Sequence, residues 1–162
     1  MCGDLHIFVN CAARDGTTVR ANFTDPVSKR TLSFALTSKG QLVECLEKVK
    51  EQYHEAYDVQ PWQYLHYDQE RVLLGHDVVK WLKDNKVQLL TSPTDTPEMN
   101  GVAEEGNKWF GDMVTTMIHY SGRPVEFWND AYEYAASLKN LLPFHTGHAY
   151  ILPCEFLSGR TP

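Results

Sequence analysis

Long apolar stretches are absent from this sequence. No run approaches the roughly 18 residues that a helix needs to span a bilayer, and no signal-peptide pattern is visible. We therefore expect no membrane association and an intracellular location.

Cysteine is scarce and is not spaced for metal or redox chemistry. The four cysteines stand at positions 2, 11, 45 and 154, so none forms a Cys-x-x-Cys pair. This excludes the usual zinc and dithiol motifs, and free thiols in a reducing compartment are expected. Of the seven histidines, His145 and His148 are the closest pair, and they fall in a Gly-containing segment that we interpret as an ordinary loop.

Basic residues are too few for an obvious nucleic-acid-binding protein. The chain has 15 Lys and Arg against 21 Asp and Glu, a formal net charge of −6. Binding to nucleic acid usually needs a basic surface, because neutralised phosphate supplies much of the affinity. Apolar residues are plentiful instead, with 43% hydrophobic and 12% aromatic residues in a chain of 162. Residues 1–162 are therefore expected to form one globular domain.

The order of apolar patterns predicts an α/β fold with a five-stranded mixed sheet flanked by helices. Residues 5–11 carry three large apolar residues in succession, which indicates a buried central strand. Short connections lead to strands over 18–24 and 31–36, as in an antiparallel meander. Further elements are predicted in the order helix, strand, helix, strand, over 38–53, 62–67, 75–85 and 87–90.

Two helices are predicted in the second half, over 98–121 and 125–142, before a short helical turn at 152–157. Most of their apolar residues fall near helical spacing, which is typical of core packing. Trp109 and Phe110 are adjacent, however, so they cannot both face the same core. We therefore expect an interface residue at this pair.

Two acids, Asp68 and Glu104, end the most informative segments. Residues 64–68 (YLHYD) predict a short strand ending in a carboxylate, and residues 97–104 (PEMNGVAE) predict a turn leading into a helix. Two such acids can bind one divalent cation, because Mg²⁺ prefers carboxylate oxygens. Two cations can clamp the attacking and leaving oxygens of a phosphodiester. A third carboxylate is expected on an earlier central strand, where this chain has Asn10.

Several strings, in one order along nearly the whole chain, resemble the integrases of copia-type LTR retrotransposons. Residues 97–104 are similar to that family's Pro-Gln-x-Asn-Gly-Val-Ala-Glu segment. Residues 127–131 (FWNDA) match its Phe-Trp-x-x-Ala helix, and residues 153–162 (PCEFLSGRTP) are similar to its closing Pro-x-Glu-x-x-x-Gly-x-x-Pro. The resemblance implies the RNase H-like fold of the retroviral integrase superfamily.

The resemblance also implies an active site. Such integrases hold two divalent metals with three carboxylates, cleave DNA 3′ ends and join them to target DNA. Asp68 and Glu104 match the second and third carboxylates and would be the metal ligands, whereas Asn10 replaces the first. An amide offers one carbonyl oxygen and no charge, so the position that bridges the two metals loses its anion.

The neighbours of the two acids depart from the family as well. After Asp68 the family has Asn-Gly, but residues 69–70 are Gln-Glu; after Glu104 it usually has Arg-Lys, but residues 105–106 are Glu-Gly. Lys108 alone remains of the basic cluster as a weak nucleic-acid contact. Its i+4 spacing from Glu104 also permits a simple ion pair.

These departures predict a catalytically silent integrase core, a pseudoenzyme from a domesticated or decayed retrotransposon. It would be nuclear rather than cytoplasmic, need no cofactor, and act through a protein partner or as a homodimer, with Asp68 and Glu104 as a relic pair. The alternative is an active Mg²⁺- or Mn²⁺-dependent nuclease or strand-transferase, in which Asp4, Asp15 or Asp25 supplies the missing carboxylate, Asp25 being the least awkward. A third hypothesis, DNA binding without cleavage, is disfavoured by the charge balance.

Overall fold

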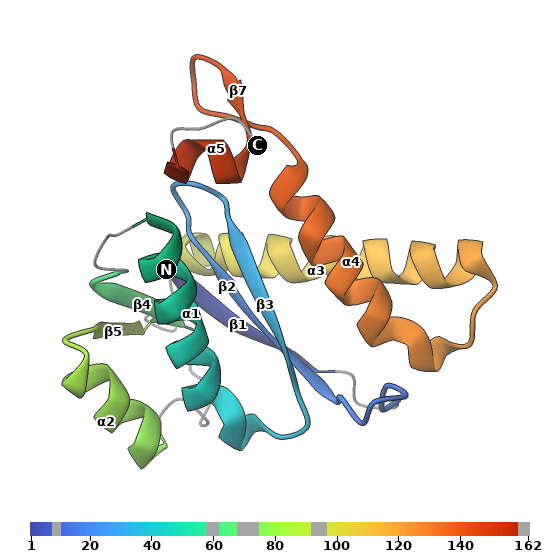
Figure 1. Cartoon of the computed structure of the whole chain (residues 1–162), viewed down its shortest axis with the longest axis horizontal. Helices are drawn as coiled ribbons and strands as arrows, with labels where there is room; N and C mark the ends of the chain where they lie inside the picture. Colours follow the sequence, from blue (N-terminus) through green and yellow to red (C-terminus); the bar gives the residue numbers. More distant parts are fainter. Residues whose placement is uncertain (8–10, 58–61, 68–74, 92–96, 159–162) are drawn as a thin grey trace.

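The structure, a computed structural model, describes residues 1–7, 11–57, 62–67, 75–91 and 97–158. They form a five-stranded sheet and a small two-stranded hairpin, with helices on both faces of the larger sheet (Figure 1). The mixed α/β architecture that the sequence predicts is confirmed.

The larger sheet has the strand order β3-β2-β1-β4-β5. Strands β1 (Cys2–Ile7), β2 (Val19–Thr24) and β3 (Thr31–Leu36) form an antiparallel meander. Strands β4 (Tyr64–Tyr67) and β5 (Gln88–Thr91) continue the sheet on the other side of β1, parallel to it. Parallel neighbours need crossover connections, and helices supply them.

Helices cover the two faces of this sheet in pairs. Helices α1 (Leu42–Tyr57) and α2 (His76–Asp84) lie on one face, and the long helix α3 (Pro97–Ser121) and α4 (Trp128–Leu141) lie on the other (Figure 1). The remaining elements are two 3₁₀ turns, two hairpin strands and a last helix: η1 (Lys39–Gln41), η2 (Val125–Phe127), β6 (Phe144–His145), β7 (Tyr150–Ile151) and α5 (Pro153–Ser158).

Strand β2 is buried along its whole length and separates two environments. Its odd-numbered residues pack with α1 and α2 in an apolar cluster. Its even-numbered residues point to the other face, because side chains alternate along a strand. There Arg20 donates a hydrogen bond to Asn129 of α4, and Asn22 donates one to Asn107 of α3. The sheet is thus joined to α3 and α4 by polar as well as apolar contacts.

Two differences from the predicted elements matter for function. The sequence predicts the first strand over 5–11, but β1 is Cys2–Ile7 and Cys11 lies in the segment after it. The predicted loop around Gly147 closes into the β6–β7 hairpin, where the Thr146 N–H donates to the Ala149 carbonyl at 2.9 Å. Within the described ranges, no helix has the length and apolar character needed to cross a membrane.

Candidate functional site

The residues that the sequence predicts for catalysis fall at the edges of the described structure. Asn10 and Asp68 lie outside the described residues, and Glu104 lies in helix α3. The described elements that lead to this site are β1, β4 and α3.

The register between β1 and β4 brings a different acid to this site. Gly3 pairs with Tyr67, the last residue of β4, and Asp68 follows Tyr67 in the sequence. Asp4 is the next residue of β1, so its register position adjoins the end of β4. Asp4 was one of three alternatives to Asn10, and the register favours it.

The backbone register also places position 4 opposite Asn22 of β2, in the antiparallel β1–β2 ladder. The Nδ2 of Asn22 donates to Oδ1 of Asn107 on α3 at 2.8 Å. Glu104 stands three residues before Asn107, which is the spacing of neighbours on a helix surface. Positions 4 and 104 are therefore linked only through Asn22 and Asn107, the pair that joins β2 to α3.

The other two acids serve in turns. Asp15 accepts hydrogen bonds from the Thr17 N–H at 3.0 Å and from Asn129 Nδ2 at 2.7 Å, and the bond from the Thr17 backbone lowers the pKa of Asp15. Asp25 accepts from Ser28 Oγ at 2.6 Å in the turn between β2 and β3. These bonds commit both carboxylates to turn structure, which removes the case for Asp25 as the replacement acid.

The sequence has carboxylates in β1, directly after β4 and in α3. Acids at positions 4, 68 and 104 would all offer carboxylate oxygens, the ligands that hard divalent cations prefer. The residues that the structure describes contain no group of three or more His, Cys, Asp or Glu placed to hold a metal ion.

Helix α3 has a glycine, Gly106, two residues after Glu104, and a side chain of α4 lies in the space beside it. A Cβ at Gly106 would lie 3.3 Å from Nζ of Lys139. This ammonium lies 4.8 Å from the ring centroid of Phe110 and 5.4 Å from that of Trp109. Burial lowers the pKa of Lys139, and the charge of Glu105 partly opposes that shift. A cation from α4 thus lies beside positions 105–106 of α3. Lys108 is exposed.

Trp109 and Phe110 both pack between α3 and α4. Phe110 is 1% exposed and stacks on Tyr132 with ring centroids 4.5 Å apart. Trp109 is half-buried and meets Phe110 edge to face at 5.2 Å. The two neighbours belong to one cluster, with Phe110 buried in it and Trp109 packed against it. The expectation that they cannot face the same core is wrong, and an interface role for either residue stays a prediction.

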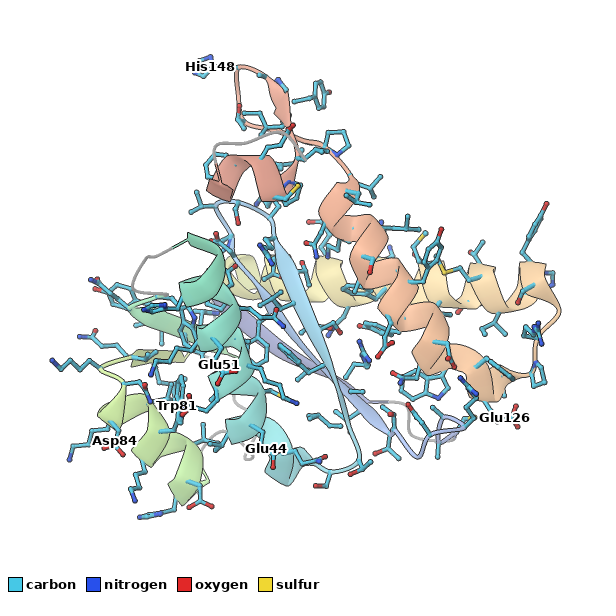
Figure 2. All side chains as sticks on the ribbon, in the orientation of Figure 1. Glu44, Glu51, Trp81, Asp84, Glu126 and His148 are labelled. Atoms are coloured by element: carbon cyan, nitrogen blue, oxygen red, sulfur yellow. The ribbon has the colours of Figure 1, made fainter. Side chains whose placement is uncertain are left out.

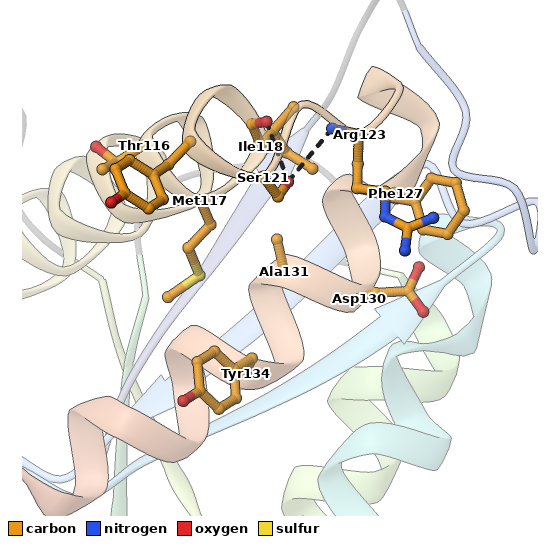
Figure 3. Close-up of a pocket in the computed structure, with 10 residues that line it drawn as sticks. Thr116, Met117, Ile118, Ser121, Arg123, Phe127, Asp130, Ala131 and Tyr134 are labelled. Atoms are coloured by element: carbon orange, nitrogen blue, oxygen red, sulfur yellow. Dashed lines mark hydrogen bonds between the residues drawn. The ribbon is translucent and has the colours of Figure 1, made fainter.

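The C-terminal end of α3 and the N-terminal end of α4, called the distal ends below, form an exposed apolar groove (Figure 3). Its volume is about 450 Å³, and ten residues line it: Thr116, Met117, Ile118, Tyr120, Ser121, Arg123, Phe127, Asp130, Ala131 and Tyr134. Tyr120 is 93% exposed and Tyr134 is 61% exposed, whereas Met117 and Ala131 between them are half-buried. Exposed apolar surface of this kind marks interaction sites.

One end of the groove carries two guanidinium groups. Arg14 and Arg123 lie 4.9 and 5.7 Å from the ring centroid of Phe127. Arg14 binds Asp130 through two hydrogen bonds of 2.8 and 3.0 Å, which lower the pKa of Asp130. Arg123 has no carboxylate within 4.0 Å among the described side chains. Its positive charge is therefore free to meet a ligand at the rim.

The two late histidines lie in the β6–β7 hairpin. The Nδ1 of His145 accepts a hydrogen bond from the Gly147 N–H at 3.2 Å, and its ring packs on Tyr150 with centroids 5.0 Å apart. His148 lies at the far end of the hairpin (Figure 2).

Comparison with solved structures identifies the fold. A chain of the simian T-cell lymphotropic virus intasome, solved in complex with PP2A regulatory subunit B56 gamma, has a TM-score of 0.75 and 13% identity, over 99% of this chain and 54% of that chain. The catalytic core domain of BIV integrase has a TM-score of 0.66 and 17% identity, over 96% of this chain and 91% of that chain. This chain therefore spans about half the length of the intasome chain. No protein-family model and no curated protein matches the sequence. The fold is that of a retroviral integrase catalytic core.

Proposed function

We propose that this chain is an integrase-core-like domain with an RNase H-like fold, derived from a copia-type retrotransposon, that does not cut or join DNA and instead binds a protein partner in the nucleus. The exposed groove between α3 and α4 is the observation that carries the proposal. Two helices that pack firmly on the sheet through Phe110 and Tyr132 present there an apolar surface that nothing in the described chain covers.

The chemistry of the groove defines the partner. Its apolar residues suit a helical segment that presents large apolar side chains at i and i+3 or i+4, the usual mode of helix-in-groove recognition. The free guanidinium of Arg123 at the rim suits a carboxylate beside those residues, because a charge-assisted hydrogen bond is stronger than a neutral one. The proposed partner is therefore an acidic amphipathic helix.

The residues around the old catalytic position support the loss of catalysis. Glu105 and Gly106 stand where the integrases that this sequence resembles carry basic residues. The nearby cation, Lys139, lies over two aromatic rings of its own chain. The net charge of the chain is −6, so it has no excess of positive charge to neutralise DNA phosphate.

The partner proposal is tested by display selection on the folded chain. A library of random helical peptides is selected on the wild type and counter-selected on Tyr134→Glu, which places a charge in the groove. Selected peptides should pair apolar residues at helical spacing with Asp or Glu, and Arg123→Glu should change the preference to Lys or Arg. Peptides that bind Tyr134→Glu equally well would contradict the proposal. Self-association, seen as a mass that rises with concentration, would make a second copy the occupant instead.

Loss of catalysis is tested with metal. A ligand that binds only the folded state must stabilise it, so millimolar Mn²⁺ should leave the melting temperature of the wild type unchanged. Asn10→Asp is the matched comparison, because it restores the charge that the family carries. A clear rise in the wild type would count against the proposal.

A second function is favoured by the β1–β4 register. Asp4 adjoins the end of β4 in the backbone register, so a metal-dependent nuclease or strand-transferase would use Asp4, Asp68 and Glu104 as its ligands. Divalent ions at such a site would neutralise charge at phosphorus. Nicking of supercoiled DNA with Mn²⁺ that disappears in both Asp4→Asn and Glu104→Gln, but persists in Asp25→Asn, would establish this function.

A further inference from the structure

We infer that the cavity around Lys139 is a binding site for a small organic acid, a molecule with one carboxylate on a compact, flat, apolar body. The cavity has a volume of about 270 Å³, and seven residues line it: Thr24, Lys29, Glu105, Gly106, Trp109, Lys139 and Phe144. It is separate from the groove at the distal ends of α3 and α4, so the inference goes beyond the proposed function and does not depend on it.

The first argument is the state of the Lys139 ammonium. The described residues place no carboxylate oxygen within 4.0 Å of it. Its contacts are two aromatic faces, with Glu105 as the charge that acts on it from α3 and Lys29 as the other charge on the cavity wall. A partly buried cation without an ion pair is costly, and an anion in the cavity would offset that cost.

The second argument is that the chain leaves room for the ammonium. Glycine is the only residue type without a Cβ, and a Cβ at position 106 would lie 3.3 Å from Nζ of Lys139. The close approach lets the ammonium reach the wall formed by α3. Gly106 thus has a local role that a helix former at this position would disturb.

The third argument is that the frame of the cavity is fixed. Asn140, next to Lys139, accepts a hydrogen bond from the Thr31 N–H and donates one to the Thr31 carbonyl, both at 2.8 Å. These bonds tie the end of α4 to β3. Lys29, in the turn before β3, adopts a left-handed backbone with φ of 60°, and its N–H donates to the Asp25 carbonyl at 2.8 Å. The backbone positions of two lysines from different elements are therefore fixed at one cavity.

The fourth argument concerns the shape of the ligand. Trp109 and Phe144 give the cavity two aromatic walls, and Phe144 is itself supported by Phe156, with ring centroids 5.7 Å apart. Flat apolar groups pack well on such walls, while a few polar groups fix orientation, as is usual in small-molecule sites. The cavity lies just below the usual size range of drug sites, which suits a body of one or two fused rings.

The experiment is a titration of the ¹⁵N-labelled chain with 2-naphthoate, followed by NMR at the Gly106 amide and the Trp109 indole N–H. Both signals should shift and saturate. Lys139→Met, which keeps the length of the side chain and removes its charge, should weaken binding about tenfold or more. Lys108→Met, an exposed change on the same helix, should leave the affinity unchanged. Gly106→Ala should also weaken binding, and it gives a second test if Lys139→Met fails to fold.

Several results would overturn the inference. One is the absence of saturable shifts in the wild type, and another is wild-type affinity for 2-naphthoate in both Lys139→Met and Gly106→Ala. A third is binding of 2-naphthalenemethanol, which has no carboxylate, as tight as that of the acid. A site that responds only to inorganic phosphate or to an oligonucleotide would likewise be a phosphate site and not the one proposed. None of these outcomes depends on whether peptides bind the α3–α4 groove.

Discussion

Arg20 on β2 and Asn129 on α4 form a buried hydrogen bond of 2.8 Å between the guanidinium Nη1 and the amide Oδ1. Arg20 is 1% exposed and Asn129 is 4% exposed. Burial lowers the pKa of Arg20, and Glu133 opposes that shift from the surface, 3.5 Å away. Asn129 also donates to Asp15, so one amide joins the sheet, α4 and the first turn.

Asn129→Ala should destabilise the fold by about 2–3 kcal/mol, because a hydrogen bond to a buried charge is lost and the charge remains. Urea denaturation would show this as a lower midpoint with an unchanged slope. Ser137→Ala, at an exposed position of the same helix, is the control and should change stability by no more than about 0.5 kcal/mol. Equal stability of the two variants would mean that the buried pair contributes little.

Gly106→Ala should stabilise the chain by up to about 1 kcal/mol, since glycine is the weaker helix former. The new Cβ would lie 3.3 Å from Lys139 Nζ, the flexible end of a side chain that can move by a few tenths of an ångström. Thermal melting measures the effect. The matched control is Gly122→Ala, which should destabilise, because φ at Gly122 is 63° and alanine is strained there. A lower melting temperature for Gly106→Ala would show that the lysine cannot yield.

Much of the fold could be predicted from local patterns. The strand Thr31–Leu36 agrees with its predicted bounds, and α3 begins and ends within a residue of its prediction. In both segments the spacing of apolar residues and the flanking turn signals agree with one another. Such elements depend little on distant parts of the chain, and this is why the sequence alone could place them.

The parts that could not be predicted depend on distant pairing. Arg20 and Asn129 are polar residues that a sequence pattern assigns to the surface, and they are buried only because they meet across 109 positions. The register that favours Asp4 over Asn10 is set by Gly3 pairing with Tyr67. No local pattern fixes such a register. A slip of β1 by one residue would move each of its side chains to the other face of the sheet.

Tyr134→Glu should leave stability within about 0.5 kcal/mol of the wild type, because the side chain is 61% exposed and covers no core. Tyr132→Ala, two residues earlier, is the contrast: this ring is fully buried and stacks on Phe110, so about 3–5 kcal/mol should be lost. Chemical denaturation of both variants checks the pair. A large loss of stability in Tyr134→Glu would mean that the groove belongs to the core. The variant could then not be used to test peptide binding alone.

Cys45 makes the stability of the fold depend on alkaline pH. Burial raises the pKa of the Cys45 thiol to about 11, from about 9 in the unfolded chain. The folded state therefore favours the protonated thiol, so its contribution is complete below pH 9 and is lost as the pH rises through about 11. By pH 10 the loss should be about 1–2 kcal/mol. Burial also raises the pKa of Tyr53, which adds to the loss of stability at higher pH.

Urea denaturation at pH 8 and pH 10 tests the role of the Cys45 thiol. Cys45→Ala should be less stable than the wild type at both pH values because packing is lost, but its stability should fall less between them. An equal fall in the two proteins would show that the Cys45 thiol does not carry the effect.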